Sequence, residues 1–247
     1  MKSPEKDDGK KKEDMLLSLY DETFELQESS PQESARERYE ILEVVDEGAS
    51  KKILKVKDSV TKRILAMATL RDTNQQHREL FEREACLTAS LQHPHILPVY
   101  DIGHHPQLGP YFTTKLIQGK SLRQLISELI SQAISMAPNQ RLEIFLKICD
   151  AISYAHSRGV LHLDLKPENI HVSDFGQVLV LDWGLAKIQD SLIKDEFIDA
   201  YSFDHIEQKY MTLHGTVKGT PGYLAPEQCA KTGKKNCRTD IYSLGVI

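Results

Sequence analysis

The chain has 247 residues, of which 40% are hydrophobic and 27% charged, an ordinary composition for a globular protein. The net charge of −5 indicates no broad basic surface, so we expect no nucleic-acid partner. There is no apolar run of about 18 residues and no apolar core in the charged N-terminus, which argues against a membrane segment in this portion and a secretory signal. Four cysteines without paired spacing favour free thiols and a cytoplasmic location, with an anchor beyond residue 247 left open.

The first part of the chain divides into a polar leader and a strand-rich region. Residues 1–38 are predicted to form a charged leader, a short helix at 15–26 and a polar linker. From Tyr39 onward, aliphatic stretches broken by turn residues predict an antiparallel meander: YEILEVVDEG, KKILKVKD and KRILAMATLR. A helical period follows over 74–91, and then two further strands, ILPVYDIGHH and GPYFTTKLI.

After Gly119 the pattern becomes mainly helical. SLRQLISELISQAISM predicts one helix, and NQRLEIFLKICDAISYAHSRG predicts another, with Leu142 and Ile148 on its buried stripe and Gly159 as its C-cap. A strand-rich half (39–116) followed by a helix-rich half (117–247) predicts an α+β fold with two lobes.

The stretch HLDLKPENI (162–170) concentrates on one rigid loop the groups that phosphoryl transfer needs. Asp164 supplies a carboxylate that orients an acceptor hydroxyl. Lys166 supplies a cation near the moving phosphoryl group, and Asn169 supplies an oxygen ligand for a metal. A polar turn between a helix and a strand is the alternative interpretation of the same residues.

This stretch resembles the catalytic loop of eukaryotic-like, bacterial-type Ser/Thr protein kinases, H-R-D-L-K-P-x-N. Similar motifs occur in the family's order: FEREA with Glu84 as the helix-C glutamate, GTPGYLAPEQ with Thr220 beside the catalytic Asp, and TDIYSLGVI with Asp240 as a buried anchor. The resemblance implies a protein-kinase-like fold with 39–116 as the N-lobe and 117–247 as a partial C-lobe. It also implies ATP and Mg²⁺ as cofactors and a protein substrate with a Ser or Thr acceptor.

Two Asp-aromatic-Gly triplets, at 174–176 and 182–184, compete for the family's metal-binding position. The separation of Asp182 from the catalytic Asp164 (182 − 164 = 18) matches that of the family. Asp182 also follows the apolar strand QVLVL, whereas Asp174 lies between two short strands in ordinary hairpin-turn composition. We therefore expect Asp182 to hold Mg²⁺ together with Asn169, and Asp174 to lie in a turn.

The resemblance also assigns a nucleotide site. Its implied residues are Gly48, Lys51, Ile53, Ala66, Glu84, Thr114, Ile117 and His171. Thr114 is the gatekeeper, the backbone of Ile117 forms the hinge, and His171 stands where the family has an apolar residue under the adenine.

The sequence departs from the family at the phosphate-binding positions. Only Gly48 remains of the three loop glycines, and Ala68 stands where the third strand normally carries a lysine. Lys51, at the third-glycine position, is placed like the phosphate-binding lysine of with-no-lysine kinases, and we expect it to compensate by pairing with Glu84. The alternative is that Lys51 is a solvated loop charge beside Lys52.

Leu163 replaces the Arg of His-Arg-Asp, so we expect that phosphorylation of the long segment 182–227 is not required for activity. A strong rise in activity on phosphorylating Thr212 or Thr216 would contradict this. The chain also ends early in the helix that contains Asp240, so we expect a truncated C-lobe with uncovered apolar surface and marginal stability.

The leading interpretation is an ATP-dependent protein serine/threonine kinase. A pseudokinase that binds nucleotide or serves as a scaffold is the alternative, because the strand lysine and two loop glycines are missing. A small-molecule kinase of the same fold is disfavoured by the peptide-docking motif GTPGYLAPE. The sequence leaves the protein substrate, the upstream signal and the oligomeric state undetermined.

Overall fold

The computed structural model describes residues 38–48, 50–71, 74–188, 219–230 and 233–247. All of them belong to one unit, Ala35–Ile247. The predicted leader, the helix at 15–26 and nearly all of the linker lie outside the described residues, as do Thr212 and Thr216. Among the described residues, no helix combines the length and apolar character needed to cross a membrane.

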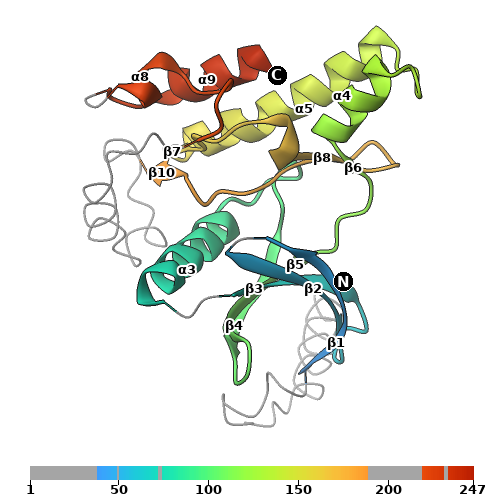
Figure 1. Cartoon of the computed structure of the whole chain (residues 1–247), viewed down its shortest axis with the longest axis vertical. Coiled ribbons are helices and arrows are strands. Elements are labelled where there is room, and N and C mark those ends of the chain that lie inside the picture. Colours follow the sequence, from blue (N-terminus) through green and yellow to red (C-terminus); the bar gives the residue numbers. More distant parts are fainter. Residues whose placement is uncertain (1–37, 49, 72–73, 189–218, 231–232) are drawn as a thin grey trace, which may run out of the picture. The chain divides into compact units, whose positions relative to one another are not determined.

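The strand-rich part is a five-stranded antiparallel sheet, as predicted (Figure 1). Its strands, in the order β1-β2-β3-β5-β4, are β1 (Tyr39–Glu47), β2 (Lys51–Asp58), β3 (Ile64–Leu70), β5 (Gly109–Lys115) and β4 (Val99–His105). Alternation within β2 sends Leu54 and Val56 to one face and Lys51 and Ile53 to the other. The sheet therefore has two distinct faces, and the predicted nucleotide residues of β2 share one of them.

Helix α3 (Gln75–Ser90) packs against the Lys51 face of the sheet. Its N-cap is Asn74, whose side chain accepts a hydrogen bond from the N–H of Gln76 at 3.0 Å. Phe81 and Phe112 meet with ring centroids 5.0 Å apart and form a small core together with Ala68. This packing fixes the next buried turn of α3, which carries Glu84, over the same face.

The helical part packs around α5 and contains the loops of the candidate site. Its elements are β6 (Lys120–Ser121), α4 (Leu122–Ile130), α5 (Pro138–Ser157), β7 (Val160–Leu161), η1 (Pro167–Asn169), β8 (Ile170–Val172), β9 (Val178–Val180), β10 (Lys187–Ile188), α8 (Pro226–Cys229) and α9 (Cys237–Val246). Antiparallel pairing joins β6, β8 and β9, and joins β7 with β10. Figure 1 shows α5 and α9 in the same region of this part, and contacts join the two helices.

Two details of the predicted helices are wrong. Helix α4 ends at Ile130, before the predicted Met136, because the chain turns at Gln132, which has φ of 58°. Leu142 is 56% exposed and not on the buried stripe of α5. It lies six residues before the buried Ile148, which places it about 120° around the helix from that stripe.

Asp58 organises the turn between β2 and β3 and gives a testable pH dependence. It is 1% exposed, accepts hydrogen bonds from the Val60 N–H and Thr61 hydroxyl at 2.9 Å each, and pairs with Arg38 at 3.4 Å. Burial raises the pKa of this carboxyl, but these donors together hold it below the ordinary value. A lowered folded-state pKa contributes stability above the ordinary carboxyl pKa, and the contribution is lost as pH falls through the folded value.

We therefore expect Asp58→Asn to be less stable than the parent chain at neutral pH, with the difference shrinking below about pH 4. Chemical denaturation across pH 3 to 7 measures the difference directly. Asp150→Asn, at an exposed position of α5, is the matched control. A stability difference that widened as the pH fell would contradict the assignment.

Candidate active site

A buried carboxylate on α9 holds the backbone of the HLDLKPENI loop. Asp240 is 0% exposed and accepts hydrogen bonds from the backbone N–H groups of His162 (2.9 Å) and Leu163 (2.8 Å). Its Oδ2 also lies 2.8 Å from Nε2 of His156 on α5. The two adjacent N–H groups donate to the two oxygens of one buried carboxylate, and hydrogen bonds to an ionised acceptor are stronger than those to a neutral one. Asp240 therefore anchors the loop, as the resemblance implied.

Asp240→Asn is expected to lower the free energy of unfolding by about 1–3 kcal/mol, because the amide replaces one of the two acceptor oxygens with an NH2 group and leaves one backbone N–H without an acceptor. Urea denaturation measures the loss. The same substitution at exposed Asp150 is expected to change it by less than about 0.5 kcal/mol. Equal effects at the two positions would show that the anchoring contacts contribute no stability.

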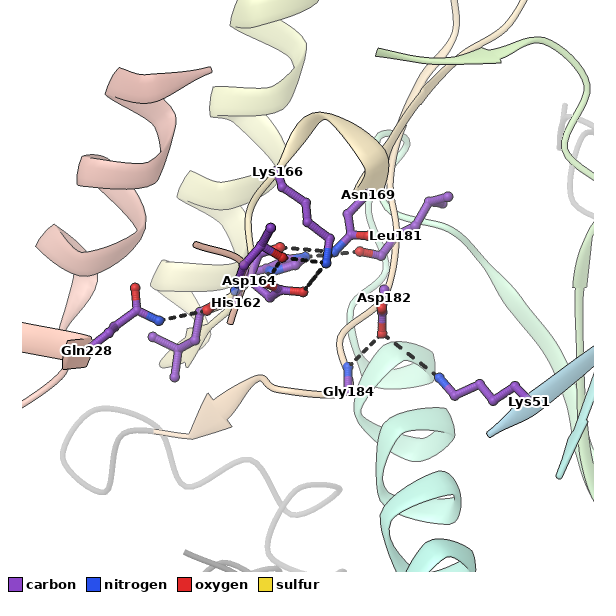
Figure 2. A network of polar contacts seen from close by, with 11 residues as sticks. Lys51, His162, Asp164, Lys166, Asn169, Leu181, Asp182, Gly184 and Gln228 are labelled. Atoms are coloured by element: carbon purple, nitrogen blue, oxygen red, sulfur yellow. Dashed lines mark hydrogen bonds and ion pairs between the residues drawn. The ribbon is translucent and has the colours of Figure 1, made fainter. Parts of the chain in front are cut away.

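Asp164 is the centre of a polar network on this loop (Figure 2). Its Oδ2 accepts from Nζ of Lys166 at 2.8 Å. Its Oδ1 accepts from both the N–H and the hydroxyl of Thr220 at 3.1 Å each. The Lys166 ammonium also reaches the Thr220 hydroxyl at 2.8 Å. The network joins the HLDLKPENI loop to the GTPGYLAPEQ segment and fixes the orientation of the carboxylate.

Asn169 and Asp182 are brought together by the pairing of β8 with β9. This ladder continues into a hydrogen bond from the Leu181 N–H to the Asn169 carbonyl, 2.8 Å long. Asp182 follows with φ of 59°, a left-handed conformation that Asp tolerates better than most residues. The next residue, Trp183, is fully buried against the His162 ring at a centroid distance of 4.6 Å. The buried indole holds the backbone that carries Asp182.

The competing triplet lies in a turn, as predicted. Asp174 and Phe175 form the turn between β8 and β9, and the Phe175 side chain is 98% exposed. Gly176 has φ of 72°, which suits a hairpin turn. The turn is thus an ordinary hairpin connection in which Asp174 and Phe175 are both exposed.

The side-chain oxygens of Asn169 and Asp182 that can act as metal ligands suit a hard cation. The Asn169 amide nitrogen donates to the Asp164 carbonyl at 2.9 Å, which leaves the amide oxygen for another ligand. The Asp182 carboxylate is half exposed. In the described part of the chain no cluster of three His, Cys, Asp or Glu forms a metal cage. Two oxygen donors with room for further ligands fit Mg²⁺, which usually retains water and substrate phosphates.

Lys51 supplies an ammonium beside Glu84, on the same sheet face as Ala68, which stands where the family's third strand carries a lysine. Ile53 is the register partner of Ala68, and Lys51 lies two residues earlier on the same face of β2. Its ammonium forms an ion pair with the Glu84 carboxylate and lies 3.9 Å from Oδ1 of Asp182 (Figure 2 shows the latter contact). Burial raises the pKa of Glu84, and the Lys51 charge opposes that rise. The alternative of a solvated Lys51 does not describe this geometry.

Most of the remaining residues predicted for the nucleotide site lie on the sheet or in a turn beside it. Ala66 pairs in register with Thr114, and both are buried on the sheet face shared by Ile53. The Thr114 hydroxyl donates to the Lys115 carbonyl at 3.3 Å, at the start of the hinge. Gly48 closes a turn by donating its N–H to the Lys51 carbonyl at 3.0 Å.

His171 is placed differently from these residues. On β8 it lines a cavity of about 300 Å³ that also includes Ile117, Leu179 and the exposed turn residue Phe175. Its Nδ1 is buried and accepts or donates no hydrogen bond within the described residues, and burial lowers the pKa of the imidazole. Ile117 is shared between the predicted nucleotide set and this cavity, whereas Ile53 and Ala66 are not among its lining residues.

Three residues that stabilise the site were not singled out by the sequence. A side chain at Gly184 would place Cβ 2.9 Å from a carboxylate oxygen of Glu84, so a larger residue there would displace the end of the Glu84 side chain. Gln228 donates to the Leu163 carbonyl at 2.8 Å (Figure 2), and Arg83 donates to the Ala186 carbonyl at 2.8 Å. Gly184 had a signal, its place in the triplet. The other two contacts join segments that are distant in the sequence.

Comparison with known proteins agrees with this geometry. The family model described as "Protein kinase domain" matches residues 39–247. The chain is 36% identical over 220 residues to "Serine/threonine-protein kinase PknD" of Protochlamydia amoebophila, covering 85% of this chain and 22% of that protein. The same-named proteins of Chlamydia trachomatis serovar D and Chlamydia muridarum are 35% and 36% identical, each over 85% of this chain and 24% of their own length.

The chain thus spans less than a quarter of the length of these curated relatives. The family match nevertheless covers the whole sheet and every element of the candidate site. It coincides with the network around Asp164 and with the paired Asn169 and Asp182. This chain belongs to the protein kinase domain family.

Proposed function

We propose that the chain transfers the γ-phosphoryl group of ATP to a Ser or Thr hydroxyl of a protein substrate. The observation that carries the proposal is the orientation of Asp164, whose two carboxylate oxygens are held separately by Lys166 and Thr220. The relatives' names as serine/threonine-protein kinases support the acceptor class. The GTPGYLAPEQ segment bonded to Asp164 supports a peptide as the acceptor.

In this proposal Asp164 accepts a hydrogen bond from the acceptor hydroxyl and aims its oxygen at the phosphoryl group. Lys166 lies 2.8 Å from the same carboxylate, so its ammonium is positioned to offset negative charge that develops between acceptor and donor. Thr220 limits the rotation of the carboxylate through two further hydrogen bonds. The chain's contribution is therefore mainly positioning and electrostatics.

Asn169 and Asp182 would hold Mg²⁺, which neutralises charge on the β- and γ-phosphates when bound. Lys51 would contact the α- and β-phosphates while remaining paired with Glu84. Ile53, Ala66, Thr114 and the Ile117 backbone would contact the rest of the nucleotide, with residues 39–116 forming the N-lobe and 117–247 part of the C-lobe. Gly48 would close the loop over the phosphates. His171 would line the hinge side of the site.

A pseudokinase remains the second candidate, because Ala68 has no ammonium and Gly48 is the single glycine of its loop. The Lys51–Glu84 ion pair supports the active enzyme, since it supplies a cation beside Asp182 from the neighbouring strand. The two candidates differ in one observable, the transfer of phosphate.

The test is incubation with MgATP labelled in the γ-phosphate and peptides that differ only in the acceptor: Ser, Thr, Tyr or Ala. We expect labelled Ser and Thr peptides and no labelled Ala peptide. Calorimetric binding of MgATP without transfer to any peptide would establish the pseudokinase instead. Transfer to the Tyr peptide at the rate of the Ser peptide would overturn the acceptor class.

A further inference from the structure

An exposed arginine on α4 bridges the two segments that meet at Asp164. Arg123 Nε donates to Oε1 of Glu168 at 2.7 Å, and its Nη2 donates to the Tyr223 hydroxyl at 2.9 Å. The guanidinium carbon also lies 6.0 Å from the centroid of the Tyr223 ring. One side chain therefore connects helix α4, the catalytic loop and the GTPGYLAPEQ segment.

The bridge lies beside the acceptor position of the proposed reaction. Glu168 belongs to η1, four residues after Asp164 on the same loop. Tyr223 is in a turn whose N–H donates to the Thr220 carbonyl at 3.1 Å, and Thr220 is bonded to Asp164. A peptide that presents a hydroxyl to Asp164 must therefore extend its neighbouring residues near Arg123, Glu168 or both.

The two charges of the bridge are not equally available to such a peptide. The Arg123 and Glu168 side chains are 47% and 43% exposed. The Glu168 carboxylate already accepts from Arg123; burial acts to raise its pKa, but the Arg123 contact and other donors lower it overall. The hydrogen bonds of Arg123 to Glu168 and Tyr223 use its Nε and Nη2 nitrogens. The guanidinium thus has a donor edge left for an anion, the group that arginine binds best.

We propose that Arg123 is a specificity-determining residue that selects acceptor peptides with an acidic side chain beside the Ser or Thr and disfavours basic ones. An acidic side chain gains the remaining donors of Arg123. A basic side chain meets the guanidinium charge and finds Glu168 already paired. The inference rests on the proposed kinase function and adds the substrate class.

The first test compares phosphorylation of three peptides that are identical except for Asp, Asn or Lys next to the acceptor. We expect the parent chain to favour the Asp peptide over the Lys peptide by about two- to fivefold in kcat/KM, the range expected for an exposed charge pair. Arg123→Gln is expected to reverse the order, because Glu168 is then free for lysine. The double variant Arg123→Gln/Glu168→Gln is expected to show no order.

Arg63→Gln, at an exposed position just before β3, is the matched control and should keep the parent ratio. The Asp-to-Lys ratio should also fall as the salt concentration rises from about 0.05 to about 0.5 M, because salt screens interactions between exposed charges. An Asp-to-Lys ratio that is the same in the parent and in Arg123→Gln would overturn the inference, as would a preference of the parent for lysine.

A second measurement separates this inference from the proposed function. Fluorescence anisotropy with labelled peptides whose acceptor is Ala reports binding without any transfer. If no peptide is phosphorylated but the Asp form still binds more tightly and loses that advantage in Arg123→Gln, the kinase proposal fails and the docking preference stands. If peptides are phosphorylated with no charge preference, the kinase proposal stands and the assignment to Arg123 fails.

Discussion

Lys51→Met is expected to lower phosphoryl transfer by about a thousandfold. A unit charge about 4 Å from a phosphate oxygen is worth about 4 kcal/mol at an effective dielectric constant of 20, and about 1.4 kcal/mol corresponds to a factor of ten in rate. No other ammonium among the described residues pairs with Glu84, and Ala68 cannot supply one. Initial rates with saturating peptide, together with MgATP binding by calorimetry, measure the loss.

The neighbouring lysine provides the control. Lys52 pairs in register with Thr69 and lies on the opposite face of β2 from Lys51, because successive residues of a strand alternate in direction. Lys52→Met removes the same charge from the same strand and is expected to leave the rate within about twofold. Equal rates for Lys51→Met and the parent chain would show that the Lys51–Glu84 ion pair does not contribute to transfer and that another cation binds the phosphates.

The ion pair between Lys51 and Glu84 illustrates what the sequence was able to predict. Alternating aliphatic residues predicted β1, β2 and β3, and the helical period predicted α3, since both patterns are local. The face on which Lys51 lies follows from counting in twos along β2. That Ile53 is opposite Ala68 depends on register, which the short turn between β2 and β3 sets and the sequence alone does not.

Features that depend on distant segments were missed. Gln228 contacts Leu163, and Arg123 contacts Glu168 and Tyr223, across separations of 65, 45 and 100 residues. No periodicity or spacing encodes such contacts. The wrong prediction for Leu142 has a different, local cause: it is an apolar residue in a helical pattern, but its angular position on α5 lies off the buried stripe.

The HLDLKPENI loop combines a buried, strained residue with the partly exposed groups that follow it. Leu163 is 5% exposed and has φ of 65°, a conformation that costs energy for a residue with a bulky side chain. Its N–H is held by Asp240 and its carbonyl by Gln228, so both sides of the strained residue are fixed. Because the backbone of Leu163 is fixed on both sides, it also fixes where the backbone of the next residue, Asp164, begins. At this position, where the family's motif has an Arg, the chain has Leu163, whose apolar side chain is buried.

Asp182→Asn is expected to lower transfer by about a thousandfold, while Asp174→Asn leaves it within about twofold. The two substitutions are chemically identical and fall in triplets of the same kind, so they differ only in place. Asp182 is next to the ladder that presents Asn169 and lies 3.9 Å from Lys51, whereas Asp174 is in the hairpin turn. Loss of a charged ligand to Mg²⁺ removes several kcal/mol of charge stabilisation, which corresponds to about three powers of ten.

Asparagine tolerates the left-handed backbone of Asp182 nearly as well as aspartate, so the fold is expected to survive the change. Matching thermal melts of the two variants would show this. Initial rates titrated with Mg²⁺ then separate the causes, because a lost ligand raises the Mg²⁺ concentration needed for half-maximal rate. A large loss in Asp174→Asn, with Asp182→Asn unaffected, would mean that the literal Asp-Phe-Gly holds the metal and that the assignment by strand and spacing is wrong.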